Sequence, residues 1–266
     1  MFVPTVSLID SAVRAEIEAR LTALASEEGV RLLLAIESGS RAWGFPSPDS
    51  DYDVRFIYVR PRRDYLALRP VRDVIERPIV DEIDLNGWDI RKALELMLKN
   101  NSVLSEWIES PIHYRDPDPI IARIAELEDR YFDPHSYASH YANLGKGAAA
   151  RWLEQGGDIA VKRYFYALRP ALAIRVLRLD PSRRPPMQLQ ALMARADLPS
   201  TLCGEIDRLV ELKAETREAG MVTRVAALEA MIVDELSRAA EVPARSVSDA
   251  FAREANELFL DLVDEE

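Results

Sequence analysis

The chain has 266 residues, a length that suits one large domain or two modest ones. Lys and Arg total 34 while Asp and Glu total 45, so the formal net charge is −11. This balance argues against a general coat for duplex nucleic acid, because counterion-release binding needs a basic surface spread over many phosphates, although a local basic groove is compatible with it. The single cysteine, Cys203, excludes an internal disulfide framework and a cysteine-based zinc site, and it indicates a reducing, cytoplasmic setting. No apolar run reaches the roughly 18–20 residues needed to cross a bilayer, so we expect no membrane partner.

The first third of the chain predicts one helix followed by strands. Apolar residues recur at helical spacing over residues 10–29, with Asp10 or Ser11 as the N-cap and Gly29 at the end. A continuous apolar run over residues 30–36 predicts a strand buried on both faces. Alternation of apolar and polar side chains over residues 51–59 predicts a second strand, and two further strands are expected at residues 73–76 and 81–88.

After residue 88 the pattern changes to the period of helices. Two helices are expected at about residues 89–99 and 102–108. Everything after Asp118 is expected to be helical, at about residues 118–130, 134–155, 158–178, 186–195, 199–219, 222–241 and 246–263. The fold class is therefore predicted to be α+β: residues 1–130 form a mixed sheet with flanking helices, and residues 131–266 form an all-helical C-terminal domain.

The residues that suggest chemistry begin at the end of the first predicted strand. There Gly39 and Ser40 follow a buried apolar run and are expected to open a short helix. Backbone N–H groups and a hydroxyl at such a turn favour an anion such as a phosphate. On the second strand, Asp51 and Asp53 are two residues apart, so their side chains share one face with Cα atoms about 6.5–7 Å apart. The two carboxylates can thus converge on cations.

A third carboxylate, Asp84, lies between two apolar residues in a later predicted strand. If this strand lies beside the one that carries Asp51 and Asp53, three carboxylates face one anion-binding turn. They would then hold two Mg²⁺ ions, or Mn²⁺ in their place, against a nucleoside triphosphate, because hard oxygen ligands suit these ions. Glu82 is two residues from Asp84 on the same face and is the alternative third ligand; the flanks of Asp84 favour Asp84.

These residues resemble the DNA-polymerase-β-like nucleotidyltransferase superfamily, whose pattern is Gly-Ser, about ten residues, Asp-x-Asp on a strand, and a later apolar-Asp-apolar triplet. A longer set of sequence motifs resembles the branch described as RNA-repair-pathway polymerase-β-family nucleotidyltransferases. It comprises Gly39-Ser40-Arg41-Ala42-Trp43-Gly44, Ser47-Pro48-Asp49-Ser50-Asp51-Tyr52-Asp53-Val54-Arg55, Asp84-Leu85-Asn86-Gly87-Trp88-Asp89, Glu106-Trp107-Ile108-Glu109-Ser110-Pro111 and Tyr164-Phe165-Tyr166-Ala167-Leu168-Arg169-Pro170. The resemblance spans about residues 30–180. It implies that Gly39 and Ser40 contact phosphates, that Asp51 and Asp53 are the principal metal ligands, and that Asp84 is the third catalytic acid.

Further candidates for nucleotide binding lie outside this core. Arg41 either reaches a phosphate or is an ordinary helix-surface residue. Lys162, Tyr166 and Arg169 recur at helical spacing and share a helix face. In relatives, a helix after the catalytic domain contacts the triphosphate and base, so Lys162 or Arg169 would pair with phosphate and Tyr166 would stack on base or ribose. The alternative is a solvated charged stripe with Tyr166 at its edge.

Three functions are compatible with this pattern. The first is a Mg²⁺-dependent nucleotidyltransferase that moves a nucleoside monophosphate from an NTP to a hydroxyl, with an RNA end in RNA repair as the expected acceptor. The second keeps the chemistry but transfers AMP to a protein or a small molecule, which the acidic net charge favours. The third is a catalytically silent nucleotide sensor, against which the three retained carboxylates argue. The sequence leaves open the choice of NTP, templating and the oligomeric state.

Overall fold

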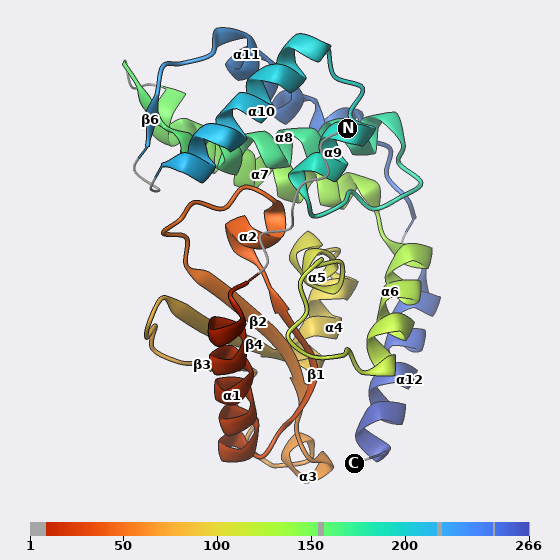
Figure 1. Cartoon of the computed structure of the whole chain (residues 1–266). Coiled ribbons are helices and arrows are strands. Elements are labelled where there is room, and N and C mark those ends of the chain that lie inside the picture. Colours follow the sequence, from red (N-terminus) through yellow and green to blue (C-terminus); the bar gives the residue numbers. More distant parts are fainter. Residues whose placement is uncertain (1–8, 154–156, 217–219, 247, 266) are drawn as a thin grey trace. The chain divides into compact units, whose positions relative to one another are not determined.

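The computed structural model describes residues 9–153, 157–216, 220–246 and 248–265 (Figure 1). Contacts between Cα atoms divide them into two compact units. The sheet unit contains residues 9–42, 51–131 and 248–265, and the helical unit contains residues 43–50, 132–153, 157–216 and 220–246. A change from one unit to the other falls between Tyr131 and Phe132.

The sheet unit is built on four strands. They are β1 (Arg31–Glu37), β2 (Tyr52–Val59), β3 (Val74–Glu76) and β4 (Ile83–Asp89), in the order β1-β2-β4-β3. The central pair, β2 and β4, is parallel, whereas β1 with β2 and β3 with β4 are antiparallel. The mixed sheet expected from the sequence is thus confirmed, and each predicted strand has its counterpart.

One face of the sheet is covered by α1 (Ser11–Glu28) (Figure 1). Asp10 caps this helix by accepting from the N–H groups of Ala12 and Val13, and Gly29 ends it in the left-handed conformation, as the sequence predicts. Buried residues of α1 join the strand residues of this face in one cluster: Ile17, Leu21, Leu24, Val54, Phe56, Tyr58, Ile83 and Leu85. Because side chains alternate along a strand, residues 53 and 55 of β2 and residue 84 of β4 belong to the opposite face.

That opposite face packs against helices that follow the strands in the chain and against a helix near the C-terminus. They are α4 (Ile90–Leu98), α5 (Ser102–Ile108), α6 (Pro119–Tyr131) and α12 (Asp249–Asp264). Although α12 comes last in the described chain, it packs against α4 and α6, and Tyr131 stacks on Phe251 with ring centroids 5.1 Å apart. Two short helices complete the unit, α2 (Gly39–Trp43), whose last residue groups with the helical unit, and α3 (Arg62–Tyr65).

The helical unit is centred on two helices, α7 (Pro134–Leu153) and α8 (Val161–Leu179), which pack against each other in one large apolar cluster. The other helices of the unit are α9 (Leu189–Arg195), α10 (Ser200–Glu215), α11 (Ala226–Ser237) and the 3₁₀ helix η1 (Arg238–Glu241). The prediction of helix alone after residue 118 is wrong at two places, because Ile159–Ala160 (β5) pairs with Met221–Val222 (β6). Each of these strands has only two residues, which is too short to show an alternating pattern in the sequence.

Candidate active site at the start of β2 and β4

The turn after β1 closes on Asp53. The Ser38 N–H donates to the carbonyl oxygen of Asp53 at 2.8 Å. Gly39 follows with φ +59°, and a Cβ atom placed on it would lie 1.9 Å from Asp53 Oδ2. Only glycine therefore allows this turn, both for its backbone conformation and for the closeness of the carboxylate. The structure brings Gly39 and Asp53 together, and Ser40 follows in α2.

Asp53 and Asp84 are neighbours across the parallel strand pair. Their Cα atoms are partners in the register of β2 and β4, and both side chains are partly exposed, at 32% and 28%. Arg55 joins them, because its Nη2 lies 2.9 Å from Asp53 Oδ1 and 2.8 Å from Asp84 Oδ2. The two carboxylates thus converge on one guanidinium group.

Asp51 lies one residue before β2 and its side chain is exposed. Its carbonyl oxygen accepts a hydrogen bond from Arg41 Nε at 3.3 Å, and the Arg41 guanidinium carbon lies 4.1 Å from the centroid of the Tyr52 ring. Arg41 is therefore held at the start of β2 by a hydrogen bond and a cation–π contact. Among the described residues, no three His, Cys, Asp or Glu side chains are grouped closely enough to hold a metal ion. The trio of acids remains a prediction.

Glu82 occupies a different position from Asp84. It precedes β4 with a left-handed φ of +63°, its side chain is exposed, and its carbonyl oxygen accepts the Tyr52 N–H at 2.8 Å. Asp84 lies inside β4 as the register partner of Asp53. Asp84, and not Glu82, is thus the acid that lies next to Asp53 across the strand pair.

The buried carboxyl group of Glu37 accepts a hydrogen bond from the backbone of Asp53. Glu37, the last residue of β1, is fully buried; its Oε1 accepts the Asp53 N–H at 3.1 Å, and its Oε2 accepts the Tyr114 hydroxyl at 2.6 Å. Burial raises the pKa of Glu37 to about 7, while these two hydrogen bonds, and to a lesser degree the charge of Arg41, oppose the rise. The same burial, together with the Glu37 charge, raises the pKa of Tyr114 above its ordinary value.

Sequence reasoning missed Glu37, Tyr114 and Arg55 as residues of the site. For Glu37 a signal was present, since an acid directly after a continuous apolar run and two residues before Gly39 is costly to bury. Tyr114 gave no local signal, because it lies in irregular chain whose N–H bonds to the Ala35 carbonyl oxygen only in the folded state. Arg55 looked like an ordinary polar position of an alternating strand.

Two of the three candidates in the helical unit, Tyr166 and Arg169, contact Trp43. The Arg169 guanidinium carbon lies 4.2 Å from the Trp43 ring centroid, and the Tyr166 ring meets Trp43 edge-on at 5.7 Å. Tyr166 is 49% exposed, whereas Arg169 is buried and Lys162, in the first turn of α8, is half-buried. Phe45 is fully buried and stacks on Phe165 with centroids 4.4 Å apart. Phe45 therefore packs in the core of the helical unit.

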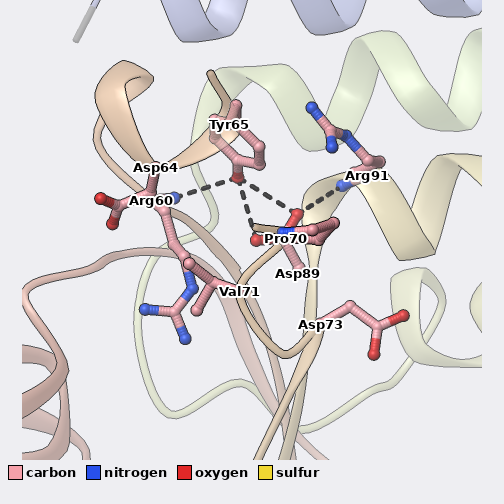
Figure 2. A pocket seen from close by; sticks show the side chains of 8 residues that line it. All are labelled: Arg60, Asp64, Tyr65, Pro70, Val71, Asp73, Asp89 and Arg91. Carbon is pink, nitrogen blue, oxygen red and sulfur yellow. Dashed lines mark hydrogen bonds between the residues drawn. The ribbon is translucent and has the colours of Figure 1, made fainter. Parts of the chain in front are cut away.

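A hollow in the sheet unit lies at the other end of the same strands (Figure 2). Asp89, which lines it, is the last residue of β4, so it is five residues from Asp84, or roughly 16 Å along the strand. Its polar centre is already paired: the Tyr65 hydroxyl donates towards the Asp89 carboxylate, at 3.1 and 3.0 Å from its two oxygens, and the Arg91 N–H donates to the same carboxylate at 2.8 Å. The hollow is thus separate from the candidate site.

The carboxylates of Asp53 and Asp84 fit a magnesium site in which substrate phosphates supply the other ligands. Mg²⁺ requires hard oxygen ligands and is commonly held by one or two carboxylates together with substrate phosphates. Both acids are partly exposed, come from adjacent strands and lie beside a turn that only glycine permits. The donor set is therefore suitable in chemistry, number and access.

Comparisons with known proteins show the family to which the chain is similar. The profile of a family described as "RNA repair pathway DNA polymerase beta family" matches residues 13–261. A protein of Bacillus subtilis (strain 168), described as "Uncharacterized protein YcgL", is 37% identical over 239 residues, which are 89% of this chain and 91% of that protein. Among solved structures, a nucleotidyltransferase-like protein from Exiguobacterium sibiricum 255-15 aligns with a TM-score of 0.31 and 11% identity, covering 94% of this chain and 80% of that one. So low a TM-score adds no argument. Across the described ranges, no helix combines the length and the apolar character required to traverse a bilayer.

Proposed function

The chain belongs to the RNA repair pathway DNA polymerase beta family and is a nucleotidyltransferase, and we propose that it transfers a nucleoside monophosphate from an NTP to a hydroxyl at an RNA end in a Mg²⁺-dependent reaction. One observation carries the proposal: Asp53 and Asp84 are register partners on adjacent parallel strands, beside the Gly39 turn. An enzyme of this class needs carboxylates next to a turn that accepts phosphates. A reducing, cytoplasmic setting remains part of the proposal.

In this proposal Asp51, Asp53 and Asp84 hold the divalent ions, which when bound neutralise the triphosphate and the departing pyrophosphate. Asp53 is fixed by its backbone, because the Ser38 N–H binds its carbonyl oxygen and Glu37 accepts its N–H. Asp84 also orients the attacking hydroxyl or accepts its proton. Gly39 and Ser40 bind the β- and γ-phosphates through the turn.

The proposal also assigns contacts to the nucleotide. Arg41, at the start of β2, contacts a phosphate. In the helical unit, Tyr166 stacks on base or ribose with its half-exposed ring, and Lys162 and Arg169 supply positive charge to the phosphates. Of these, Arg169 is the least suited, because it is buried against Trp43.

A matched set of three variants tests the proposal. Purified Asp53→Asn, Asp84→Asn and Glu82→Gln proteins are incubated with each α-³²P-labelled NTP, Mg²⁺, and an RNA that ends in a free hydroxyl. Both Asn variants are expected to lose transfer by at least about a hundredfold, because each removes a charged oxygen ligand. Glu82→Gln should stay within a few fold of the wild type. Unchanged transfer by Asp53→Asn would refute the proposal. If Glu82→Gln loses transfer and Asp84→Asn does not, Glu82 rather than Asp84 is the third acid.

The acceptor is tested in the same assay. The net charge of −11 favours a protein or small-molecule acceptor of AMP as the second candidate, since a polynucleotide needs a basic groove. Label that enters protein or a small molecule, and never RNA, would replace the RNA acceptor by that candidate. Nucleotide binding that is independent of Mg²⁺, with no product on any acceptor, would instead indicate a silent sensor.

A further inference from the structure

Arg55 lies between the two acids that face the candidate metal site. Its Nη2 is within 3 Å of one oxygen of each acid, at 2.9 Å from Asp53 Oδ1 and 2.8 Å from Asp84 Oδ2. The two oxygens can therefore be no farther apart than the sum of these distances. Within the described part of the chain, Arg55 is the only side chain that hydrogen-bonds the Asp84 carboxylate. One guanidinium group thus contacts both acids.

The guanidinium group is fixed to the strands. Its Nη1 donates to the carbonyl oxygens of Val54 and Asp84, both at 3.1 Å, and its side chain is only 19% exposed. These contacts to two carboxylates and two carbonyl oxygens hold the guanidinium group in place. It also engages only one oxygen of each acid, and the second oxygen of Asp53 lies towards Gly39. Arg55 and a divalent ion can therefore occupy the site together.

We propose that Arg55 is a positioning residue that makes divalent-ion binding depend on the nucleotide, by holding a positive charge against Asp53 and Asp84. This inference rests on the proposed function. Asp51, Asp53 and Asp84 carry three negative charges, while Arg41 and Arg55 carry two positive charges. The site therefore keeps a single net negative charge, which attracts a divalent ion weakly. The negative charges of a triphosphate restore the attraction, so the ion and the nucleotide bind with positive coupling. Arg55 also removes the repulsion between two like charges on adjacent strands.

Mn²⁺ binding tests this inference without any measurement of transfer. The free Mn²⁺ signal in electron paramagnetic resonance gives the affinity of the full chain, alone and with the α,β-methylene analogues of ATP, GTP, CTP and UTP in turn. Arg55→Gln is expected to bind Mn²⁺ alone at least about tenfold more tightly than the wild type, since a unit charge near a divalent ion is removed. The factor by which the analogue tightens Mn²⁺ binding should shrink correspondingly.

Two control variants separate charge from folding. Arg72→Gln removes an exposed arginine of the same unit, which pairs with Glu76 at 2.7 Å, and should leave Mn²⁺ affinity within about twofold of the wild type. Arg55→Lys keeps the charge and should stay within about threefold. Thermal melts report whether each variant is folded. If Arg55→Gln binds Mn²⁺ no more tightly than Arg72→Gln, or Arg55→Lys binds as tightly as Arg55→Gln, the inference is overturned.

The same measurement tells a failure of this inference from a failure of the proposed function. Asp53→Asn should remove the Mn²⁺ site in the wild type and in the Arg55→Gln background. If it does so while Arg55→Gln alone has no effect, the metal site stands and the role of Arg55 is overturned. If it leaves Mn²⁺ binding unchanged in both backgrounds, the metal site itself is overturned, and the inference with it.

Discussion

The Glu37→Gln variant is expected to remove a pH dependence of stability that arises from the burial of one carboxyl group. Glu37 is fully buried at the end of β1, and burial raises its pKa from 4.5 to about 7. The folded protein therefore binds this proton more tightly than the unfolded chain does. The stabilisation is fully present below about pH 4.5 and is lost as the pH rises towards 7.

The magnitude follows from the size of the pKa shift. A shift from 4.5 to about 7 corresponds to about 3 kcal/mol of unfolding free energy when the pH passes through the whole interval. Of this, about 2.5 kcal/mol falls between pH 5 and pH 8. Glutamine fits the same contacts without ionising, because its Oε1 accepts the Asp53 N–H and its amide donates to the Tyr114 oxygen.

Urea denaturation of the wild type and the variant at pH 5, 6, 7 and 8 measures this effect. The free energy of unfolding of the wild type, minus that of Glu37→Gln, should fall by about 2.5 kcal/mol from pH 5 to pH 8. Taking the difference cancels groups that titrate equally in both proteins, such as His113, whose pKa is lowered by burial. Glu126→Gln, on the exposed side of α6, is the control and should show almost no change. A difference that stays constant across the pH range would refute the reasoning.

Three other substitutions have expected outcomes. Tyr114→Phe removes a donor that favours ionised Glu37, so it should destabilise the fold more at pH 8 than at pH 5 in the same urea series. Gly39→Ala should abolish transfer, because its Cβ would meet the Asp53 carboxylate, whereas Gly29→Ala, with φ +62° and no atom within 4 Å, should cost only about 1 kcal/mol in a thermal melt. Glu235→Gln should cost about 3 kcal/mol in urea, because this acid is buried against two arginines of α8; a loss under 1 kcal/mol would contradict this.

The sheet unit was predictable because its elements have strong local patterns. The Asp10 cap, the Gly29 stop and the helical spacing between them define α1, and the alternation from Tyr52 to Val59 defines β2. The same alternation correctly placed Asp53 on the face opposite Val54. For the site, the pattern around Gly39 and Asp53 was specific enough to indicate the family. Whether the Asp84 strand lies beside β2 stayed open in the sequence, and the structure pairs the two strands.

What the sequence could not predict depends on contacts between distant segments. Glu37 and Tyr114 are 77 residues apart and meet only because the chain after α5 returns along the end of β1. The docking of α12 on α4 and α6 is equally non-local, since an amphipathic helix does not reveal which surface it covers. Arg55 gave no signal because its role depends on an acid 29 residues away, brought near by parallel pairing.

The geometry of the candidate site is set by the core on the other face of the sheet. A shift of one residue between β2 and β4 would turn Asp84 away from Asp53 and would expose Ile83 and Leu85, which are buried with α1. Gly87 adds a steric lock, because a Cβ there would lie 2.0 Å from the ring of Phe56, its register partner. The apolar cluster under α1 therefore fixes the register, and the register places the two carboxylates where Arg55 can reach both. Stability and function share this strand pair, so substitutions in its core affect the site even though they never touch it.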